Sequence, residues 1–343
     1  MHTRLSVEEF LQEASFRVLL DVRTPAEFEK GHIPGAINFP IFSNEERAEI
    51  GTLYKQVSPE VAFTRGLELV GGRLIDYIKK AHALAPRRKI AIHCWRGGKR
   101  SQSMAEFLQT AGFEVVSLIG GYKAYRNFVL EKLQSTALPL LIIGGRTGTG
   151  KTAILHALKE KGEQVIDLEG LAHHKGSAFG WLGEEDQPTV EQFENVLWDT
   201  ICHLDILKRI WVENESRKIG TVFIPDGFWE QKATGVLFNL ELSREERIQR
   251  LIQDYADYDL GDLLHSFEKI KKRLGGLAFK EAAEAIESGD AAKAAAIGLM
   301  YYDKTYDHCI TTGKFKQIID LTITNQPAIT AQCLIEKANE IKL

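Results

Sequence analysis

The residues from 139 to 160 constrain the fold of this chain most tightly. An apolar run, PLLIIGG, leads directly into the pattern GxxxxGK[ST] and then into a helical pattern, AILHALKEKG. A strand, a glycine-rich turn and a helix in this order form a phosphate-binding loop (P-loop), because backbone N–H groups at the turn approach phosphate oxygens closely. The predicted diphosphate-binding residues are Gly145, Arg146, Thr147, Gly148, Thr149, Gly150, Lys151 and Thr152.

The P-loop alone does not say which phosphate compound it holds. Lys151 supplies a positive charge and the Thr152 hydroxyl is a candidate Mg²⁺ ligand. A nucleotide kinase or ATPase usually adds a carboxylate at the end of a neighbouring strand, and the candidates are Asp167, Glu213 and Asp226. Each is weak alone, so no metal ligand is assigned with certainty. We expect no tightly bound cofactor.

A second anion-binding loop is indicated around Cys94. The cysteine follows the apolar run KIAIH and precedes WRGGKRS, where a strand ends and a helix begins. Glycines at such a turn let successive N–H groups face an anion, and the nearby cations stabilise a thiolate, which is what a nucleophilic cysteine requires. The predicted catalytic residues are Cys94, Arg96 and Arg100, and the rest of the loop is Trp95, Gly97, Gly98, Lys99 and Ser101.

The chain is expected to form two α/β domains. Its 343 residues exceed what one hydrophobic core usually serves. Short β-rich runs alternate with helical patterns on both sides of a boundary near residue 135, which is typical of parallel sheets. We therefore expect one domain at 1–135 and a P-loop domain at 136–343. Predicted strands are 16–22, 36–40, 89–94 and 114–120, then 139–145, 164–170 and 209–215, and 61–84 is predicted as a helix interrupted by glycines.

Beyond Leu242 the pattern becomes helical, with predicted helices over 243–258, 263–274 and 280–302. One of these carries a basic run. The net charge of −4 means that a nucleic acid would have to be held by such a local patch. Two interpretations stay open, an RNA-binding face or ordinary solvated helix charge. The residues concerned are Lys269, Lys271, Lys272 and Arg273, with His265 and Phe267 nearby.

Two further polar stretches follow predicted strands, at 168–180 and 213–220. Open α/β sheets bind ligands at the carboxyl ends of their strands. The cations and glycines in both stretches favour a contact with an anion or RNA over a bland solvated loop. The candidate contacts are His173, His174, Lys175 and Ser177 in the first stretch, and Glu215, Ser216, Arg217 and Lys218 in the second.

Cysteine spacing and hydropathy argue against several other classes of protein. The four cysteines, Cys94, Cys202, Cys309 and Cys333, form no CxxC pair, so disulfides and structural zinc are not expected. The apolar run ALPLLII at 137–143 is too short to cross a bilayer, and the first residues do not resemble a signal peptide. We expect a cytoplasmic protein that does not act at a membrane.

The first 130 residues resemble two groups that share a fold. DVRTPAEFEKGHIPGAINFP at 21–40, followed by the cysteine loop, resembles the rhodanese superfamily, in which Asp21 and Arg23 belong to a structural motif. The segment from His93 to Arg100 also matches the HCx5R pattern of cysteine phosphatases. The loop is one residue longer than is common in rhodaneses that move a single sulfur. It is therefore better suited to a tetrahedral, phosphate-sized donor.

Over nearly its full length the chain resembles the tRNA 2-selenouridine synthase family. The resemblance rests on DVRTPAEF, GHIPGAINFP, CWRGGKRS, GGRTGTGKT, HHKGSAFG and ENESRKIG. SNEERAEIGTLYKQ at 43–56 is the most diagnostic stretch, because ordinary rhodaneses have no counterpart between the GHIPGA strand and the cysteine strand.

This resemblance implies a transferase that replaces sulfur by selenium in tRNA. The implied substrate is 2-thiouridine at the wobble position of tRNAs for Lys, Glu and Gln. Geranyl diphosphate alkylates the sulfur, and selenophosphate then delivers selenium while geranylthiol leaves. The P-loop would hold the diphosphate and the longer cysteine loop would hold selenophosphate.

Two alternatives stay open at this point. One is a cysteine-dependent phosphatase or sulfurtransferase coupled to a P-loop kinase or ATPase domain, which HCx5R supports. The other is a non-enzymatic nucleotide-sensing module. The presence of both Cys94 and Lys151 tells against the second, because a scaffold needs neither a nucleophile nor a phosphate cradle.

Overall fold

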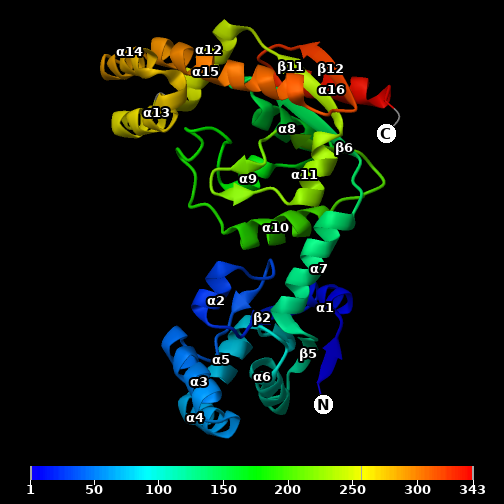
Figure 1. Ribbon diagram of the computed structural model, residues 1–343. Coiled ribbons are helices and arrows are strands. Elements are labelled where there is room, and N and C mark those ends of the chain that lie inside the picture. The colour runs from blue at the N-terminus through cyan, green and yellow to red at the C-terminus, as the bar shows by residue number, and fades with distance from the viewer. Residues whose placement is uncertain (1, 256, 342–343) are drawn as a thin grey trace. The chain divides into compact units, whose positions relative to one another are not determined.

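The computed structural model describes residues 2–255 and 257–341, in one unit that ends at Lys132 and a second that begins at Leu133. Each unit contains a five-stranded sheet whose paired strands all run parallel (Figure 1). Parallel sheets carry their crossover helices on the faces, so both units are α/β. The predicted fold class is confirmed.

The first unit has the strand order β1-β5-β4-β2-β3. Strand β4 is apolar and buried because α5 and α6 cover one face of the sheet, where Tyr77, Met104 and Leu108 pack on it. Its elements are β1 (Thr3–Leu5), α1 (Val7–Ala14), β2 (Val18–Asp21), α2 (Pro25–Lys30), β3 (Ile37–Asn38), α3 (Asn44–Gln56), α4 (Pro59–Gly71), α5 (Leu74–Leu84), β4 (Lys89–His93), α6 (Lys99–Thr110), β5 (Glu114–Leu118) and α7 (Gly121–Ser135).

The stretch SNEERAEIGTLYKQ forms helix α3. Ser43 caps this helix and Glu46 completes a capping box. This pair of residues is a sequence signal for the start of a helix. Helix α3 packs on α4 and buries none of its own side chains fully. The predicted helix over 61–84 is present as α4 and α5, which separate at the two glycines 71 and 72.

The second unit has the strand order β12-β11-β6-β8-β7. All six residues of β6 are buried, because the strand is central and α8 and α16 pack against the same core. Its elements are β6 (Leu140–Gly145), α8 (Lys151–Glu160), β7 (Gln164–Ile166), α9 (Leu168–Ala172), α10 (Val190–Cys202), β8 (Ile210–Glu213), β9 (Lys218–Ile219), β10 (Val222–Phe223), α11 (Asp226–Ala233), β11 (Val236–Glu241), α12 (Arg244–Tyr255), α13 (Leu260–Leu274), α14 (Gly276–Glu287), α15 (Ala291–Thr312), β12 (Gln317–Thr322) and α16 (Pro327–Asn339).

Three sequence predictions for this unit are corrected. The predicted strand 164–170 ends at Ile166, and Asp167 caps the short helix α9. The region after Leu242 is not wholly helical, since β12 returns to the sheet beside β11. The predicted helix 280–302 is two helices, because Gly289 has φ +78° and Asp290 caps a new helix.

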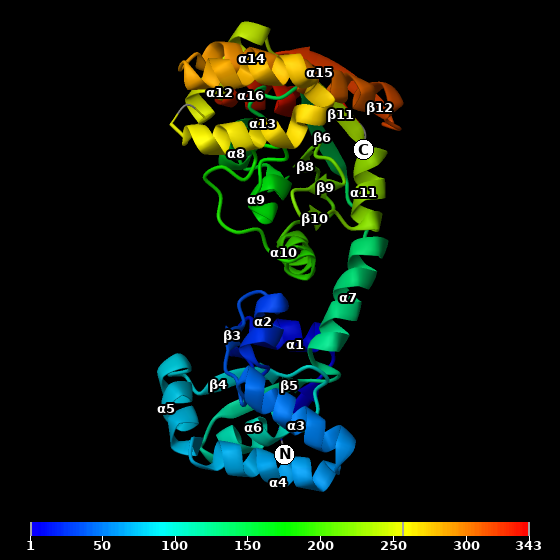
Figure 2. The same cartoon turned by 60° about the vertical axis from the view of Figure 1, so that its left-hand side comes forward.

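Helices α12 to α15 gather beside the sheet of this unit, and α15 packs on α12, α13 and α14 (Figure 2). In the described part of the chain no helix is both long enough and apolar enough to cross a bilayer.

Candidate active sites

The P-loop wraps tightly under helix α12. Gly148 and Gly150 both have φ +83°, a conformation that side chains disfavour. A Cβ at Gly150 would overlap the guanidinium of Arg250, which shows how closely this arginine approaches the loop. Lys151 Nζ lies 3.4 Å from the Gly145 carbonyl oxygen, across the loop. The loop therefore has the geometry that its sequence predicts.

Two arginines of α12 add positive charge to the P-loop. Arg247 Nη1 donates to the Thr147 carbonyl at 3.2 Å, and Asp303 holds the same guanidinium through contacts of 2.7 and 2.9 Å. Arg250 Nη2 donates to Asn325 Oδ1, while its buried Nε has no hydrogen-bond partner among the described residues. A buried, unpaired N–H beside a phosphate cradle is a donor for a phosphate oxygen.

Sequence reasoning missed both arginines. The available signal was their three-residue spacing in REERIQR, on a helix that directly follows strand β11. Nothing in that pattern says that the helix folds back over residues a hundred positions earlier, so the signal was weak.

A cluster of carboxyl groups lies beside the P-loop. The Thr152 hydroxyl donates to Glu169 Oε2 at 2.8 Å, and the Glu169 N–H donates to Glu213 Oε1 at 2.7 Å. Burial, together with the negative charge of Glu215, raises the pKa of Glu169 to about 8. Burial also raises the pKa of Glu213. At neutral pH Glu169 is therefore mostly protonated, which limits the negative charge next to the phosphate cradle.

The three carboxylates that were candidate Mg²⁺ ligands lie in different environments. Asp167 caps α9 and lines the cleft described below, whereas Glu213 is buried. Asp226 pairs with Arg217 at the start of α11, and the strand before it belongs to a separate two-stranded ribbon rather than to the main sheet. Within residues 2–255 and 257–341, no group of three or more His, Cys, Asp or Glu side chains is arranged to hold a metal.

The P-loop opens into a cleft of about 1000 Å³ in the second unit. Thr152 and Lys151 line it, together with the Lys232 side chain, whose Nζ donates to the Glu215 carbonyl at 2.8 Å. Burial lowers the pKa of Lys232 to about 8. Predicted residues in the lining are Gly145, Thr147, Gly148, Gly150, Lys151, Thr152, Lys175, Ser177, Glu215, Ser216 and Arg217.

The other predicted residues of this unit are not in the cleft lining. Arg146 pairs with Asp307 at 2.7 Å, and the Thr149 hydroxyl donates to the Arg146 carbonyl at 2.5 Å. His173 is the left-handed cap of α9, and burial lowers the pKa of His174. Lys218 Nζ lies 5.4 Å from the Phe223 ring centroid. Their roles stay predictions.

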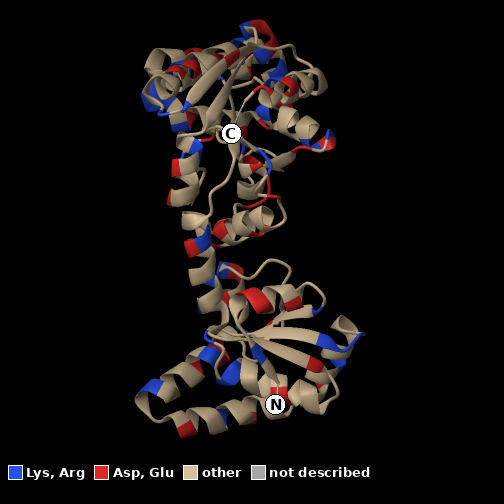
Figure 3. Ribbon diagram, turned by 90° about the vertical axis from the view of Figure 1, so that its right-hand side faces the viewer, with Lys and Arg blue, Asp and Glu red and all other residues tan. Residues whose placement is uncertain are grey.

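Three residues of the basic run in α13 contact aromatic side chains. Lys269 Nζ lies 4.8 Å from the Trp181 ring, Lys271 Nζ lies 4.4 Å from the Phe279 ring, and Arg273 donates to the Tyr301 hydroxyl at 3.0 Å. Phe267, beside this run, is 4% exposed and packs in the helical core, so its side chain is not part of an exposed face, and both interpretations of the basic run stay open. Acidic and basic residues are both spread over the second unit in Figure 3.

The cysteine loop of the first unit folds around a buried thiol. Cys94 is 3% exposed, and the Ser101 hydroxyl lies 3.2 Å from its sulfur. The loop packs on a glycine pair that sequence reasoning missed: Gly121 has φ +61°, and a Cβ there would overlap the Cys94 carbonyl. Helix α6 begins directly after the loop, with Gly98 as its N-cap. The sulfur therefore lies at the N-terminus of α6, where it contacts the Ser101 hydroxyl and, at 4.0 Å, the Gly98 carbonyl oxygen.

The cations of this loop point in different directions. Arg100 forms a double contact with Glu27, at 2.6 and 3.1 Å, and this partner holds the pKa of Glu27 below its ordinary value although burial alone would raise it. Lys99 Nζ lies 4.9 Å from the Phe63 ring, and Arg96 is exposed. Trp95 is half-buried beside Tyr122. Arg100 is therefore a positioned cation rather than a free one.

Asp21 and Arg23 form a buried ion pair behind the loop, at 2.5 Å. Arg23 also donates to the Gly31 carbonyl at 2.7 Å and lies over the Tyr122 ring at 3.8 Å. Tyr122 in turn donates its backbone N–H to the Cys94 carbonyl at 2.8 Å. The pair therefore supports the cysteine loop from beneath, as the structural motif implies.

Both units match known families. Residues 5–128 match the rhodanese-like domain, and residues 138–324 match the tRNA 2-selenouridine synthase AAA domain. A tRNA 2-selenouridine synthase from Shewanella denitrificans is 37% identical over 79% of this chain and 78% of its own length. One from Sulfurovum sp. strain NBC37-1 is 36% identical over 82% and 84%. The chain belongs to the tRNA 2-selenouridine synthase family.

Membership of the tRNA 2-selenouridine synthase family confirms the resemblance seen in the sequence. It makes the protein an enzyme of the transferase type, so the non-enzymatic interpretation no longer stands. A third relative of the same name, from Nitrosomonas europaea, is 36% identical over 69% of this chain and 63% of its own length.

Burial of Glu169 in this synthase predicts a pH-dependent stability. Between the ordinary carboxyl pKa of 4.5 and the folded value of about 8, the folded state holds one proton more than the unfolded state. The free energy of unfolding therefore falls as pH rises through this range, by about 1 kcal/mol per pH unit. Glu169→Gln should show a shallower fall, because glutamine carries no titrating proton.

Urea unfolding of the second unit at pH of about 5.5, 6.5 and 7.5 measures this difference. Glu213, whose pKa is raised mainly by burial, contributes with the same sign in both proteins, and losing the nearby Glu169 charge lowers its pKa, which also makes the fall shallower. Lys232, with its pKa near 8, acts mainly above the window. Equal slopes in the two proteins would contradict the assignment of a retained proton to Glu169.

Proposed function

We propose that this enzyme replaces sulfur by selenium in 2-thiouridine at the wobble position of tRNA, in two steps. The P-loop unit transfers a geranyl group to the sulfur, and the rhodanese-like unit supplies selenium. The observation that carries the proposal is the phosphate cradle in which Lys151, Arg247 and Arg250 gather around one glycine-rich turn. Such a set of cations suits the departure of a diphosphate.

The first step forms a carbon–sulfur bond. The sulfur of 2-thiouridine attacks C1 of geranyl diphosphate, the C1–O bond breaks, and diphosphate leaves with the electron pair. The base loses its N3 proton, so the product is neutral S-geranyl-2-thiouridine. The leaving diphosphate gains negative charge in the transition state, and Lys151 and the loop N–H groups stabilise that charge.

The second step exchanges sulfur for selenium. The selenium of selenophosphate bonds to C2 of the base, the C2–S bond breaks, and the sulfur leaves as geranylthiol after taking a proton. The Cys94 thiolate then attacks phosphorus, the Se–P bond breaks, and water hydrolyses the resulting S–P bond, which releases phosphate and restores the thiol. Cys94 thus takes part in the transfer, and the length of its anion-binding loop in the sequence suits a tetrahedral donor.

Mg²⁺ fits the first site as a partner of the diphosphate. The Thr152 hydroxyl and the Asp167 carboxylate both line the cleft, and Mg²⁺ typically combines one or two protein oxygens with phosphate oxygens and water. The proposed tRNA substrates are those for Lys, Glu and Gln, and the proposed location is the cytoplasm. No ATP hydrolysis is required.

Omitting one donor at a time tests the order of the two steps. With geranyl diphosphate alone, S-geranyl-2-thiouridine should accumulate in the tRNA. With selenophosphate alone, 2-thiouridine should remain unchanged, because its sulfur is then a poor leaving group. Formation of 2-selenouridine without geranyl diphosphate, detected by mass spectrometry of the nucleosides, would contradict the proposal.

A further inference from the structure

The helical part of the second unit contains an apolar cavity of about 220 Å³ that adjoins the large cleft. It lies between α12, α13, α14 and α15, and carbon atoms dominate its walls. Its side chains include the edge-to-face pair Phe179 and Phe267, whose ring centroids are 5.0 Å apart. The role proposed so far for this unit does not use the cavity.

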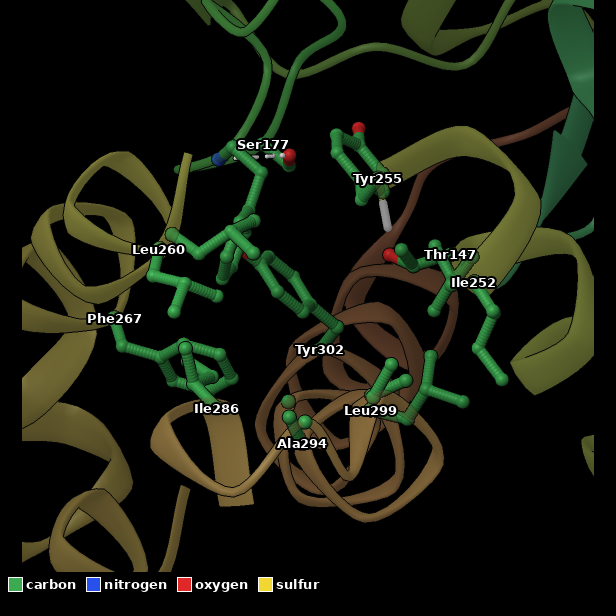
Figure 4. Close-up of a pocket in the computed structure, with 17 residues that line it drawn as sticks. Thr147, Ser177, Ile252, Tyr255, Leu260, Phe267, Ile286, Ala294, Leu299 and Tyr302 are labelled. Carbon is green, nitrogen blue, oxygen red and sulfur yellow. Dashed lines mark hydrogen bonds between the residues drawn. The ribbon is translucent and has the colours of Figure 1, made fainter. Parts of the chain in front are cut away.

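One end of the cavity opens at the P-loop. Five residues line both the cavity and the large cleft, so the two spaces meet there. Figure 4 shows Thr147, Ser177 and Tyr255 at this polar end, and Phe267, Ile286 and Ala294 at the far, apolar end, with Tyr302 between them. The shared residues are Thr147, Ser177, Leu251, Tyr255 and Tyr302.

The apolar walls of the cavity and the adjoining P-loop together indicate which kind of ligand would bind there. An apolar cavity offers water few hydrogen-bond partners, and one of about 150 Å³ lined by Leu, Ile and Phe already holds benzene. The present cavity is larger and adjoins a phosphate cradle. A ribose or a nucleobase would lose its hydrogen bonds among these carbon walls. A diphosphate joined to a short hydrocarbon chain satisfies both ends.

The α15 side of the cavity is built from small residues, which keeps this volume open. Ala291, Ala294, Ala295 and Gly298 all line it. A Cβ at Gly298 would lie 3.6 Å from the Phe267 ring, an ordinary contact, so an alanine would fit there. Alanine is also the better helix former. Gly298 therefore keeps the cavity open. Neither the contact with Phe267 nor the helix itself requires a glycine at this position.

We propose that this cavity holds the geranyl chain of geranyl diphosphate and sets the chain length that the enzyme accepts. The inference rests on the proposed function and adds where the apolar half of the donor lies. The diphosphate occupies the P-loop, C1 lies near Thr147 and Tyr255, and the chain runs toward Phe267 and Ile286. A chain longer than geranyl has to extend past Phe267 and Ile286, which lie at the far end of the cavity.

Calorimetric binding to the full-length protein tests this directly, with inorganic diphosphate, dimethylallyl diphosphate and geranyl diphosphate as probes. The matched variants are Ala295→Leu, which adds a side chain inside the cavity, and Ala292→Leu, which makes the same change at an exposed position of α15. Ala295→Leu should weaken geranyl diphosphate at least about tenfold, because even one misplaced methylene in an apolar pocket costs that much. Inorganic diphosphate should bind both variants like the wild type.

The second variant is expected to gain binding, and misfolding cannot produce such a gain. Ile286→Ala lengthens the apolar end, so the fifteen-carbon farnesyl diphosphate should bind it at least about tenfold more tightly than it binds the wild type. The inference is overturned if Ala295→Leu and Ala292→Leu bind geranyl diphosphate equally, or if Ile286→Ala gains nothing.

These binding results are independent of catalysis, which separates two failures. A wild type that binds geranyl diphosphate more tightly than inorganic diphosphate, but alkylates no tRNA, contradicts the proposed function and leaves the chain-binding cavity standing. A wild type that geranylates tRNA while the two alanine variants behave alike contradicts the cavity alone.

Discussion

Replacing Lys151 by alanine should lower the rate of geranylation by about 10²- to 10³-fold while leaving selenation of tRNA that already carries S-geranyl-2-thiouridine at the wild-type rate. Lys151 is the cation inside the P-loop, where its Nζ lies 3.4 Å from the Gly145 carbonyl. Removing a group that stabilises developing charge typically costs this much in rate. The two half-reactions are followed separately by mass spectrometry of the nucleosides.

Lys159→Ala is the matched control, because Lys159 is an exposed lysine on the same helix. It should leave both half-reactions unchanged. If Lys151→Ala slowed both half-reactions equally, the division of labour between the two units would be contradicted. Unchanged geranylation in Lys151→Ala would contradict the placement of the diphosphate in the P-loop.

Replacing Cys94 by serine should have the opposite effect, a loss of selenation on the order of 10³-fold or more with geranylation retained. The two side chains have nearly the same shape, so the loop and the contact with Ser101 can persist. A serine hydroxyl is a far weaker nucleophile than the thiol group, and removing a nucleophile is among the most costly changes to an active site.

Cys202→Ser supplies the control for this change. Cys202 is exposed at the end of α10 and lies outside both anion-binding loops. Both half-reactions should proceed normally in this variant. Normal selenation in Cys94→Ser would show that the thiol takes no part in the transfer.

The sequence predicted the parts of the sites that depend on local structure. A P-loop and a strand-loop-helix cysteine motif each lie within about a dozen residues, so backbone conformation and residue type are enough to define them. The same holds for α3, whose capping box is written in Ser43 and Glu46. The break in 61–84 followed from its glycines in the same way.

The parts that depend on distant contacts were missed. Arg250 reaches Gly150 across a hundred residues, and strand β12 joins β11 after an intervening bundle of helices. Glu169 was placed in a predicted strand, whereas Asp167 caps the short helix α9 and Glu169, within that helix, accepts a hydrogen bond from the Thr152 hydroxyl. The alanines of α15 carry no sequence signal of a cavity, and packing against α13 and α14 turns them into a cavity wall.

Complete conversion by the wild type tests the central claim most directly. The purified protein is incubated with tRNA that carries 2-thiouridine, geranyl diphosphate and selenophosphate, and the nucleosides are analysed by mass spectrometry. We expect S-geranyl-2-thiouridine to appear first and 2-selenouridine to replace it. If neither nucleoside formed, the assignment of this activity to the two anion-binding loops would be contradicted.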